Sequence, residues 1–308
     1  MRRGQSGINC LLAIDKPVGM SSHDVVNRVR RALGERRVGH AGTLDPAASG
    51  VLVVGVGQGT RLMGMLTQDS KAYEARIAFG RETDTDDAEG SVVREAAPPE
   101  RASDAGYASG VLSSLEGEVD QVPPAYSAIS VGGRRSYQRA RSGEKVELPA
   151  RRVTIESARL LGVEDGGRVW HCRFDVSKGT YIRSIARDLG RSLGSAAHLC
   201  GLRRVSSGTV GIERCVTIDE IEASGREGVT SHMLDPVSAL DLPVRPIDED
   251  EYADAMCGKP LSSLGLVLDE GQRVALVHRG SVVGVWHLEG GRLRCDANFP
   301  DGISGVGR

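Results

Sequence analysis

One short loop holds the residues best suited to chemistry. Residues 39–52 read GHAGTLDPAASGVL, in which Gly39 and Gly42 let the backbone turn tightly and approach a bound ligand. Asp45 is the single carboxylate of this loop and is therefore our candidate catalytic residue. The alternative is structural, because aspartate is a good N-cap and Pro46 is a favoured first helical residue.

A cation and an aromatic residue lie near the start of a helix that the pattern predicts over 180–189. Arg183 is in the first turn, where it faces the positive end of the helix dipole at a cost of roughly 0.3–1 kcal/mol. A carboxylate or phosphate opposite it would explain the placement, and a solvated arginine on the outer face is the alternative. Tyr181 follows a glycine-rich turn, so it could stack on a base or pack in the core.

A second chemistry, metal-dependent hydrolysis, would combine Asp45 with Asp84, Asp86 and Asp87. No histidine stands at ligand spacing beside these acids, so we expect no metal. The six cysteines are far apart and form no CxxC pair, which indicates reduced thiols and a cytoplasmic location. No apolar run approaches the ~20 residues that a membrane span needs, so we expect no membrane partner.

The charge is distributed unevenly along the chain. A net charge of −2 argues against a nucleic-acid partner. However, residues 121–214 carry 17 basic and 8 acidic side chains, whereas residues 1–120 and 215–308 have net charges of −3 and −8. Because distant charges are screened, the basic middle third is a candidate nucleic-acid surface. A solvated charged face is the alternative.

Hydrophobic periodicity predicts the elements that must position these residues. A length of 308 residues suggests two domains, or one domain with an appendage. The pattern predicts strands at 8–14, 51–56, 73–79 and 169–176, a helix after a capping box at 21–24, the helix at 180–189 stopped by Gly190, and a short helix at 251–257. It also predicts a solvated connection at 82–107, a linker at 243–246 and three short strands within 273–299.

Six motifs in fixed order resemble the bacterial tRNA pseudouridine-55 synthases, the TruB family. They are Asp15-Lys16-Pro17-x-Gly19, the loop 39–52, Lys71-Ala72-Tyr73, Gln121-x-Pro123-Pro124-x-Tyr126-Ser127-Ala128, SKGTYIR at 177–183, and His198-Leu199-x-x-Leu202-Arg203-Arg204. The resemblance covers roughly residues 8–243. It implies isomerisation of one uridine in the T-arm of tRNA, without a cofactor or metal. It also implies an α/β (α+β) pseudouridine-synthase fold with a mixed, largely antiparallel sheet.

The resemblance also implies a role for each matching residue. Asp45 matches the catalytic aspartate, which acts as a nucleophile or as a base. Tyr73 matches the tyrosine that stacks on the flipped base, and Arg183 matches the arginine that pairs with the carboxylate and keeps it ionised. His40 matches the residue that fills the space left by the base, with a backbone-bonded loop histidine as the alternative. The other substrate-binding candidates are Lys16, Gly42, Thr43, Leu44, Tyr181, Leu202, Arg134 and Arg135.

The same resemblance implies the domain organisation and the partners. Residues 1–243 would form the catalytic domain, and 244–308 resemble a small PUA-like β domain. A basic arm at about 127–152 would close over the T-loop through phosphate contacts. Ser130 stands where the family has a lysine, so one RNA contact is in question. We expect a monomer that acts on tRNA, and a non-catalytic tRNA-binding or folding protein is the alternative.

Overall fold

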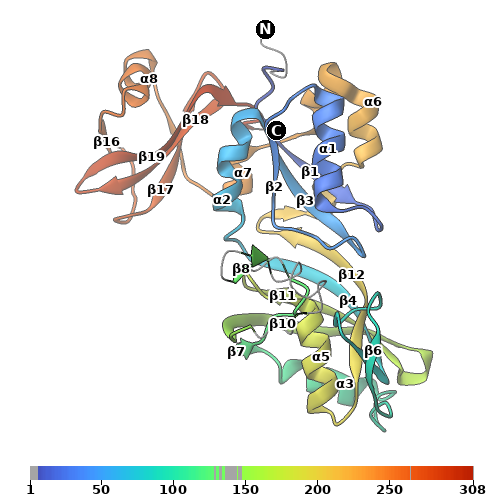
Figure 1. Ribbon diagram of the computed structural model, residues 1–308. Helices are drawn as coiled ribbons and strands as arrows, with labels where there is room; N and C mark the ends of the chain where they lie inside the picture. Colours follow the sequence, from blue (N-terminus) through green and yellow to red (C-terminus); the bar gives the residue numbers. More distant parts are fainter. Residues whose placement is uncertain are drawn as a thin grey trace. The chain divides into compact units, whose positions relative to one another are not determined.

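The computed structural model describes residues 6–127, 144, 148–263 and 265–307, and the backbone of 130–131 and 134–135. The chain forms two compact units (Figure 1). Unit 1 combines the residues up to Asp69 with those from Ser206 onward, and unit 2 comprises Ser70–Val205. Each unit contains its own hydrophobic core.

The central strand of unit 1, β1 (Cys10–Lys16), is buried on both faces. Leu11 and Ala13 belong to one core cluster, whereas Leu12 and Ile14 belong to another. A strand that is covered on both sides needs apolar residues at consecutive positions, which explains the uninterrupted apolar residues at 10–14. The strand predicted there is confirmed.

Helices cover one face of this strand and its neighbours. β1 pairs antiparallel with β3 (Ala48–Val56) and β14 (Met233–Leu234), and β3 also pairs with β2 (Val38–Ala41). The amphipathic helices α1 (Ser22–Leu33) and α6 (Ile218–Gly228) lie side by side over this face (Figure 1). The predicted capping box is confirmed, because Ser21 and Asp24 hydrogen-bond to each other's backbone at the start of α1. The remaining short elements of this part are η1 (Gly57–Leu62), α2 (Met63–Leu66), β13 (Val210–Gly211), η3 (Ile212–Arg214), η4 (Val229–His232) and α7 (Pro236–Leu240).

The C-terminal part of unit 1 is a five-stranded sheet with α8 (Glu249–Met256) at its side. Its strand order is β15 (Val244–Pro246), β17 (Arg273–His278), β18 (Ser281–Glu289), β19 (Arg292–Ile303) and β16 (Leu261–Ser262). The three predicted strands and the short helix are confirmed. The linker predicted at 243–246 is wrong, because residues 244–246 pair in parallel with β17. Proline is tolerated at such a sheet edge.

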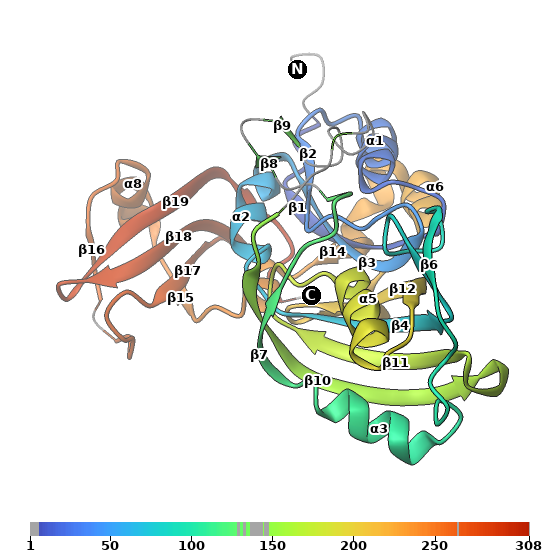
Figure 2. The same cartoon turned by 60° about the horizontal axis from the view of Figure 1, so that its bottom comes forward.

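Unit 2 is a sheet with α3 (Ala105–Ser113) and α5 (Ile182–Ser192) packed on it (Figure 2). The strand order is β12 (Ala197–Ser207), β4 (Lys71–Phe79), β11 (Val169–Val176), β10 (Arg151–Glu164) and β7 (Gly117–Gln121), and the last two residues of β12 belong to unit 1. The pairings of β4, β11, β10 and β7 are antiparallel, as predicted. The buried residues of β11 alternate, and the helix face of Ile182, Ile185 and Leu189 is in the core. The shorter elements are β5 (Arg81–Thr83), β6 (Val92–Glu95), η2 (Asp165–Gly167), β8 (Ser130–Val131) and β9 (Arg134–Arg135).

Two further expectations about unit 2 are wrong. Residues 82–107 are not simply a solvated connection, since they contain the hairpin of β5 and β6 and the start of α3. Glu82 and Asp86 of this segment are buried. In addition, Gly190 does not stop α5, which continues to Ser192. A Cβ atom on Gly190 would lie 2.5 Å from the backbone nitrogen of Ala197, so glycine is required for close approach of the helix to the chain that enters β12.

We therefore expect Gly190→Ala to destabilise the protein by about 1–3 kcal/mol, because the added methyl group meets backbone that cannot yield. Gly110 of α3 offers a matched control, since nothing lies within 4 Å of a Cβ built there. Gly110→Ala should be neutral or stabilising by about 0.5–1 kcal/mol. Urea unfolding of both variants measures the difference, and equal effects at the two sites would contradict the packing argument.

Candidate active site

In unit 1, the loop between β2 and β3 presents Asp45 at a turn. Gly42 has a φ of +79°, which favours glycine, and it starts the loop after β2 ends. The backbone N–H of Ala48 donates to the carbonyl of Asp45 at 3.0 Å. The N-cap alternative is wrong, because this bond closes a turn and no helix follows before β3 begins at Ala48. Asp45 is half-buried and Thr43 is exposed.

One hydroxyl group binds both backbone polar groups of Leu44, the residue before Asp45. Ser22 Oγ donates to the carbonyl of Leu44 at 2.9 Å and accepts from the N–H of Leu44 at 2.9 Å. Both residues are buried, with 3% of their surface exposed. A buried pair of hydrogen bonds is not weakened by water. The backbone that leads into Asp45 is therefore fixed to the start of α1.

The residue after Asp45 is held by the turn that follows β1. The carbonyl of Pro46 accepts from the N–H of Gly19 at 2.8 Å and from Lys16 Nζ at 3.4 Å. Lys16 Nζ also donates to the carbonyls of Pro17 (2.9 Å) and Met20 (2.6 Å), and the lysine side chain is fully buried. A buried ammonium group needs such partners. These contacts favour a positioning role for Lys16, and its predicted contact with substrate stays a prediction.

His40 lies in β2, two residues before Gly42. It is half-buried and opposes Val54 of β3. Unit 1 thus places the candidates from His40 to Asp45 in one strand and the loop that follows it, and Lys16 Nζ bonds to this loop at the carbonyl of Pro46.

In unit 2, Arg183 projects from the first turn of α5 and is 7% exposed. Its guanidinium donates to the carbonyls of Thr85 (3.1 Å) and Tyr126 (3.0 Å) and lies 3.5 Å from the carboxylate of Asp87. The solvated alternative is wrong. Asp87 places one carboxylate beside Arg183, and the predicted pairing of Arg183 with Asp45 stays a prediction.

Arg183 is the first of three arginines spaced four residues apart along α5. Arg187 lies 2.9 Å from the carboxylate of Asp86, and Arg191 pairs with Glu82. Residues at this spacing share one face of a helix. The three arginines therefore attach α5 to the segment 82–87. Two of the acids in the metal-dependent alternative, Asp86 and Asp87, are engaged by arginine. Among the residues that the structure describes, no group of three or more His, Cys, Asp and Glu side chains is placed to hold a metal ion.

Asp86 should make stability depend on pH. Burial raises the pKa of Asp86 to about 6, although Arg187 and Arg183 oppose the shift. Between about pH 4 and pH 6 the folded protein therefore holds a proton that the unfolded chain has released. The stabilisation by protonated Asp86 is present below pH 4 and is lost as the pH rises to about 6, with a total on the order of 1–3 kcal/mol.

The comparison of wild type with Asp86→Asn isolates this effect. We expect the wild type to lose free energy of unfolding relative to Asp86→Asn from pH 4 to pH 6, with no further change above about pH 7. Urea unfolding at each pH measures it. A constant difference, or one that grows with pH, would contradict the raised pKa.

The N-terminus of α5 also holds the segment 121–127. The Gln121 side chain accepts from the N–H of Tyr181 at 2.8 Å and donates to the carbonyl of Tyr181 at 3.1 Å. The carbonyl of Val122 accepts from Ser184 and Arg187, both at 2.9 Å. Because the carbonyl of Tyr126 also accepts from Arg183, this segment is fixed immediately before the predicted arm.

The other predicted residues of unit 2 have different surroundings. Tyr73 of β4 and Leu202 of β12 are partly buried against the core of the unit. Tyr181 is half-buried, and its stacking on a base stays a prediction. Arg134 and Arg135 form β9, but their side chains and most of the arm at 127–152 lie outside the described residues.

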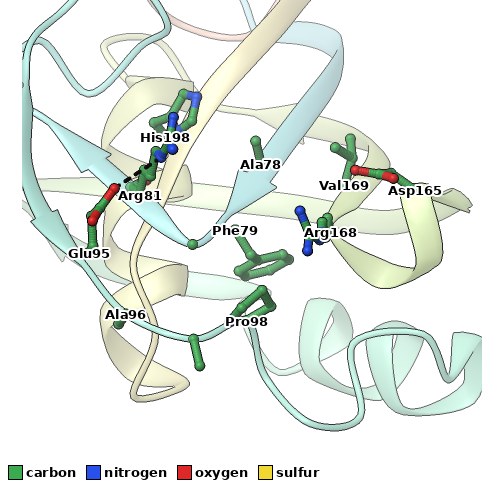
Figure 3. Close-up of a pocket in the computed structure, with 12 residues that line it drawn as sticks. Ala78, Phe79, Arg81, Glu95, Ala96, Pro98, Asp165, Arg168, Val169 and His198 are labelled. Carbon is green, nitrogen blue, oxygen red and sulfur yellow. Dashed lines mark hydrogen bonds and ion pairs between the residues drawn. The ribbon is translucent and has the colours of Figure 1, made fainter.

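A hollow in unit 2 lies at the opposite end of β4 from Tyr73 (Figure 3). Phe79 and Pro98 line it, and Arg81 forms an ion pair with Glu95 at 3.1 Å. His198 Nδ1 is 2.9 Å from the carbonyl of Arg81. His198, from the sixth motif, therefore contacts the β5–β6 hairpin and not the end of β4 that carries Tyr73.

Sequence reasoning missed the positioning roles of three residues that hold the candidates in place. Ser22 clamps Leu44, Gln121 clamps Tyr181, and Asp87 pairs with Arg183. The capping box next to Ser22 was a usable signal, since it places the next residue at the buried start of a helix. Asp87 carried no such signal, because its partner is far away in the sequence.

Two family models match the chain. A family model described as TruB family pseudouridylate synthase (N terminal domain) matches residues 30–182. A model described as tRNA pseudouridylate synthase B C-terminal domain matches residues 183–249. In the part of the chain that the structure describes, no helix is long and apolar enough to cross a membrane.

Curated relatives align along most of the chain. The tRNA pseudouridine synthase B of Mycobacterium sp. (strain KMS) is 44% identical over 286 residues, which is 92% of this chain and 93% of the relative. That of Thermobifida fusca (strain YX) is 44% identical over 283 residues, with 88% and 94% covered. That of Rhodospirillum rubrum is 39% identical over 304 residues, with 95% and 96% covered.

Solved structures agree on the fold. The crystal structure of a Cbf5-Nop10-Gar1 complex contains a chain with a TM-score of 0.70 and 24% identity, covering 98% of this chain and 88% of that chain. The chain in an archaeal box H/ACA sRNP Nop10-Cbf5 complex has a TM-score of 0.68. The predicted fold class is confirmed. With family models matched from residue 30 to 249 and relatives about 40% identical along nearly the whole length, this chain belongs to the TruB family of pseudouridylate synthases.

Proposed function

We propose that this protein is a tRNA pseudouridine synthase that isomerises uridine 55 in the T-loop, and that Asp45 performs the chemistry. The observation that carries the proposal is family membership over residues 30–249, in which Asp45 occupies a loop whose backbone is hydrogen-bonded on both sides of it. Relatives named tRNA pseudouridine synthase B support tRNA as the substrate.

The reaction rearranges one bond and needs no external reactant. The bond from ribose C1′ to uracil N1 breaks, the uracil rotates, and C5 bonds to C1′. C5 then loses its proton and N1 carries one, so the composition is unchanged. Asp45 starts this sequence as a nucleophile or as a base. Its loop suits either role, because anchored backbone on both sides lets a carboxylate meet the substrate without reorganising.

The remaining site residues are proposed to bind and orient the flipped uridine. Tyr73 stacks on the base, Arg183 pairs with the catalytic carboxylate, and His40 fills the space left in the RNA. The contacts that hold Arg183 to Thr85, Asp87 and Tyr126 support this, since they fix a cation that would otherwise be mobile. We further propose that the protein acts as a cytoplasmic monomer without metal, with 1–243 as catalytic domain and 244–308 as a PUA-like domain.

The direct test maps pseudouridine in tRNA. Unmodified tRNA is incubated with the protein, and carbodiimide-dependent primer stops locate pseudouridine. We expect one stop at position 55, and none in a matched tRNA with cytidine 55. A stop at another position would contradict the uridine-55 assignment alone. Intact binding without any stop would favour the alternative, a non-catalytic tRNA-binding or folding protein.

Replacing arm arginines should weaken tRNA binding and flatten its salt dependence. If Arg134, Arg135 and Arg139 each contact a phosphate, changing all three to glutamine should reduce the slope of log K against log salt by about 0.9 per lost contact. Filter binding across a salt series measures this slope. An unchanged slope would mean that these arginines do not touch RNA.

A further inference from the structure

We propose that Ser22 is a positioning residue for the Asp45 carboxylate, an inference that rests on the proposed function. Ser22 is the first residue of α1, and its hydroxyl makes both hydrogen bonds that the Leu44 backbone offers, at 2.9 Å each. Leu44 directly precedes Asp45 in the chain. The orientation of the Leu44 peptide therefore sets the direction in which the Asp45 side chain leaves the loop.

The position of Ser22 is itself fixed by the start of α1. Ser21 and Asp24 form the capping box, in which Ser21 Oγ accepts from the N–H of Asp24 at 3.1 Å and the Asp24 carboxylate accepts from the N–H of Ser21 at 3.0 Å. This cap stabilises the end of the helix, while the burial of Val25, Val26 and Val29 in the core holds α1, and with it Ser22, in place. The Ser22 side chain is buried, so water does not compete for the two bonds to Leu44.

The other side of Asp45 is anchored independently. The carbonyl of Pro46 accepts from the N–H of Gly19, and Asp45 itself closes a turn to Ala48. Without the Ser22 hydroxyl, the loop keeps these anchors but loses the one that precedes the carboxylate. The loop then remains folded while the carboxylate is free to rotate away from the reacting uridine. A displacement of this kind lowers the rate of chemistry more than it lowers substrate binding.

Ser22→Ala tests this, with Ser21→Ala as the matched control one residue away. Ser21→Ala removes the helix cap but leaves the Leu44 clamp. We expect Ser22→Ala to lower the single-turnover rate of pseudouridine formation by about 10²-fold. The Kd for tRNA should stay within about twofold, and the fall in Tm should be similar to that of Ser21→Ala. Ser21→Ala should keep a rate within about threefold of wild type.

A second pair of variants separates the hydroxyl from packing. Ser22→Thr and Ser22→Val add the same methyl group, but only threonine can make the two bonds, so threonine should be at least tenfold faster than valine. Equal rates for Thr and Val would overturn the inference, as would a Ser22→Ala rate equal to that of Ser21→Ala, or a rate loss matched by an equal loss of tRNA affinity. An inactive wild type would overturn the proposed function and this inference together. An active wild type with an equally active Ser22→Ala would overturn this inference alone.

Discussion

Asp45→Asn should abolish pseudouridine formation while tRNA binding stays within a few-fold of wild type. The amide has nearly the shape of the carboxylate but is a poor nucleophile and no base. The loop anchors at Leu44 and Pro46 use backbone atoms, so they survive the substitution. We expect a rate loss of at least about 10³-fold, as for other residues that carry out the chemical step. Tritium release from C5-labelled uridine in tRNA measures the rate, and filter binding measures the affinity.

The same chemical change at a helix cap provides the control. Asp104 is the N-cap of α3 and accepts from the N–H of Tyr107 at 3.0 Å. Asp104→Asn should keep the wild-type rate, with a loss of stability of about 1 kcal/mol or less. Residual activity above 10% in Asp45→Asn would argue against a direct chemical role for this carboxylate. A large loss of affinity would instead mean that the side chain shapes the RNA-binding surface.

Much of the fold follows from local patterns. The alternation at 169–176 indicates a strand with one face in the core, and the consecutive apolar residues at 10–14 indicate a strand with both faces covered. The capping box at Ser21 placed the start of α1 correctly. These signals can be read locally, because they depend on whether each position of a strand or helix is buried and not on which residue it contacts.

The errors arose where a residue's partner is distant in sequence. Glu82 and Asp86 gave their segment the composition of a solvated connection, yet both are buried against arginines about 100 residues later. Gly190 matches the local pattern of a helix stop, but glycine is needed there because the backbone that enters β12 leaves no space for a side chain. In the sequence, the two members of a buried ion pair cannot be distinguished from charged residues on the surface.

In the candidate site, too, some residues could be identified from the local sequence and others depend on distant partners. Asp45 was identifiable as a candidate because glycines and small residues surround it, and Arg183 because a cation in a first helical turn needs an anion. That Asp87 also lies beside Arg183 could not be read from the chain. The clamps by Ser22 and Gln121 were equally hidden, since a serine or glutamine that bonds to backbone leaves no pattern in its partner's side chain.

Arg183→Lys should lower the rate of pseudouridine formation by about 10²-fold or more, although the charge is kept. The guanidinium of Arg183 reaches the carbonyls of Thr85 and Tyr126 and the carboxylate of Asp87 at once. The planar fork of arginine allows this, whereas a single ammonium nitrogen on a shorter side chain reaches one or two of these groups. A lysine would therefore leave buried carbonyls unsatisfied and hold the positive charge in a different place.

Arg187→Lys on the next turn of α5 separates this effect from loss of packing. Arg187 is also buried and ion-paired, with Asp86, and it shares the carbonyl of Val122 with Ser184. Both variants should lose stability, but we expect a large rate loss only for Arg183→Lys, because only Arg183 is proposed to pair with the catalytic carboxylate. Single-turnover assays at equal folded fractions make the comparison. If the two variants lose rate equally, the arginines act together as a scaffold for α5, and the pairing of Arg183 with Asp45 is not what the reaction requires.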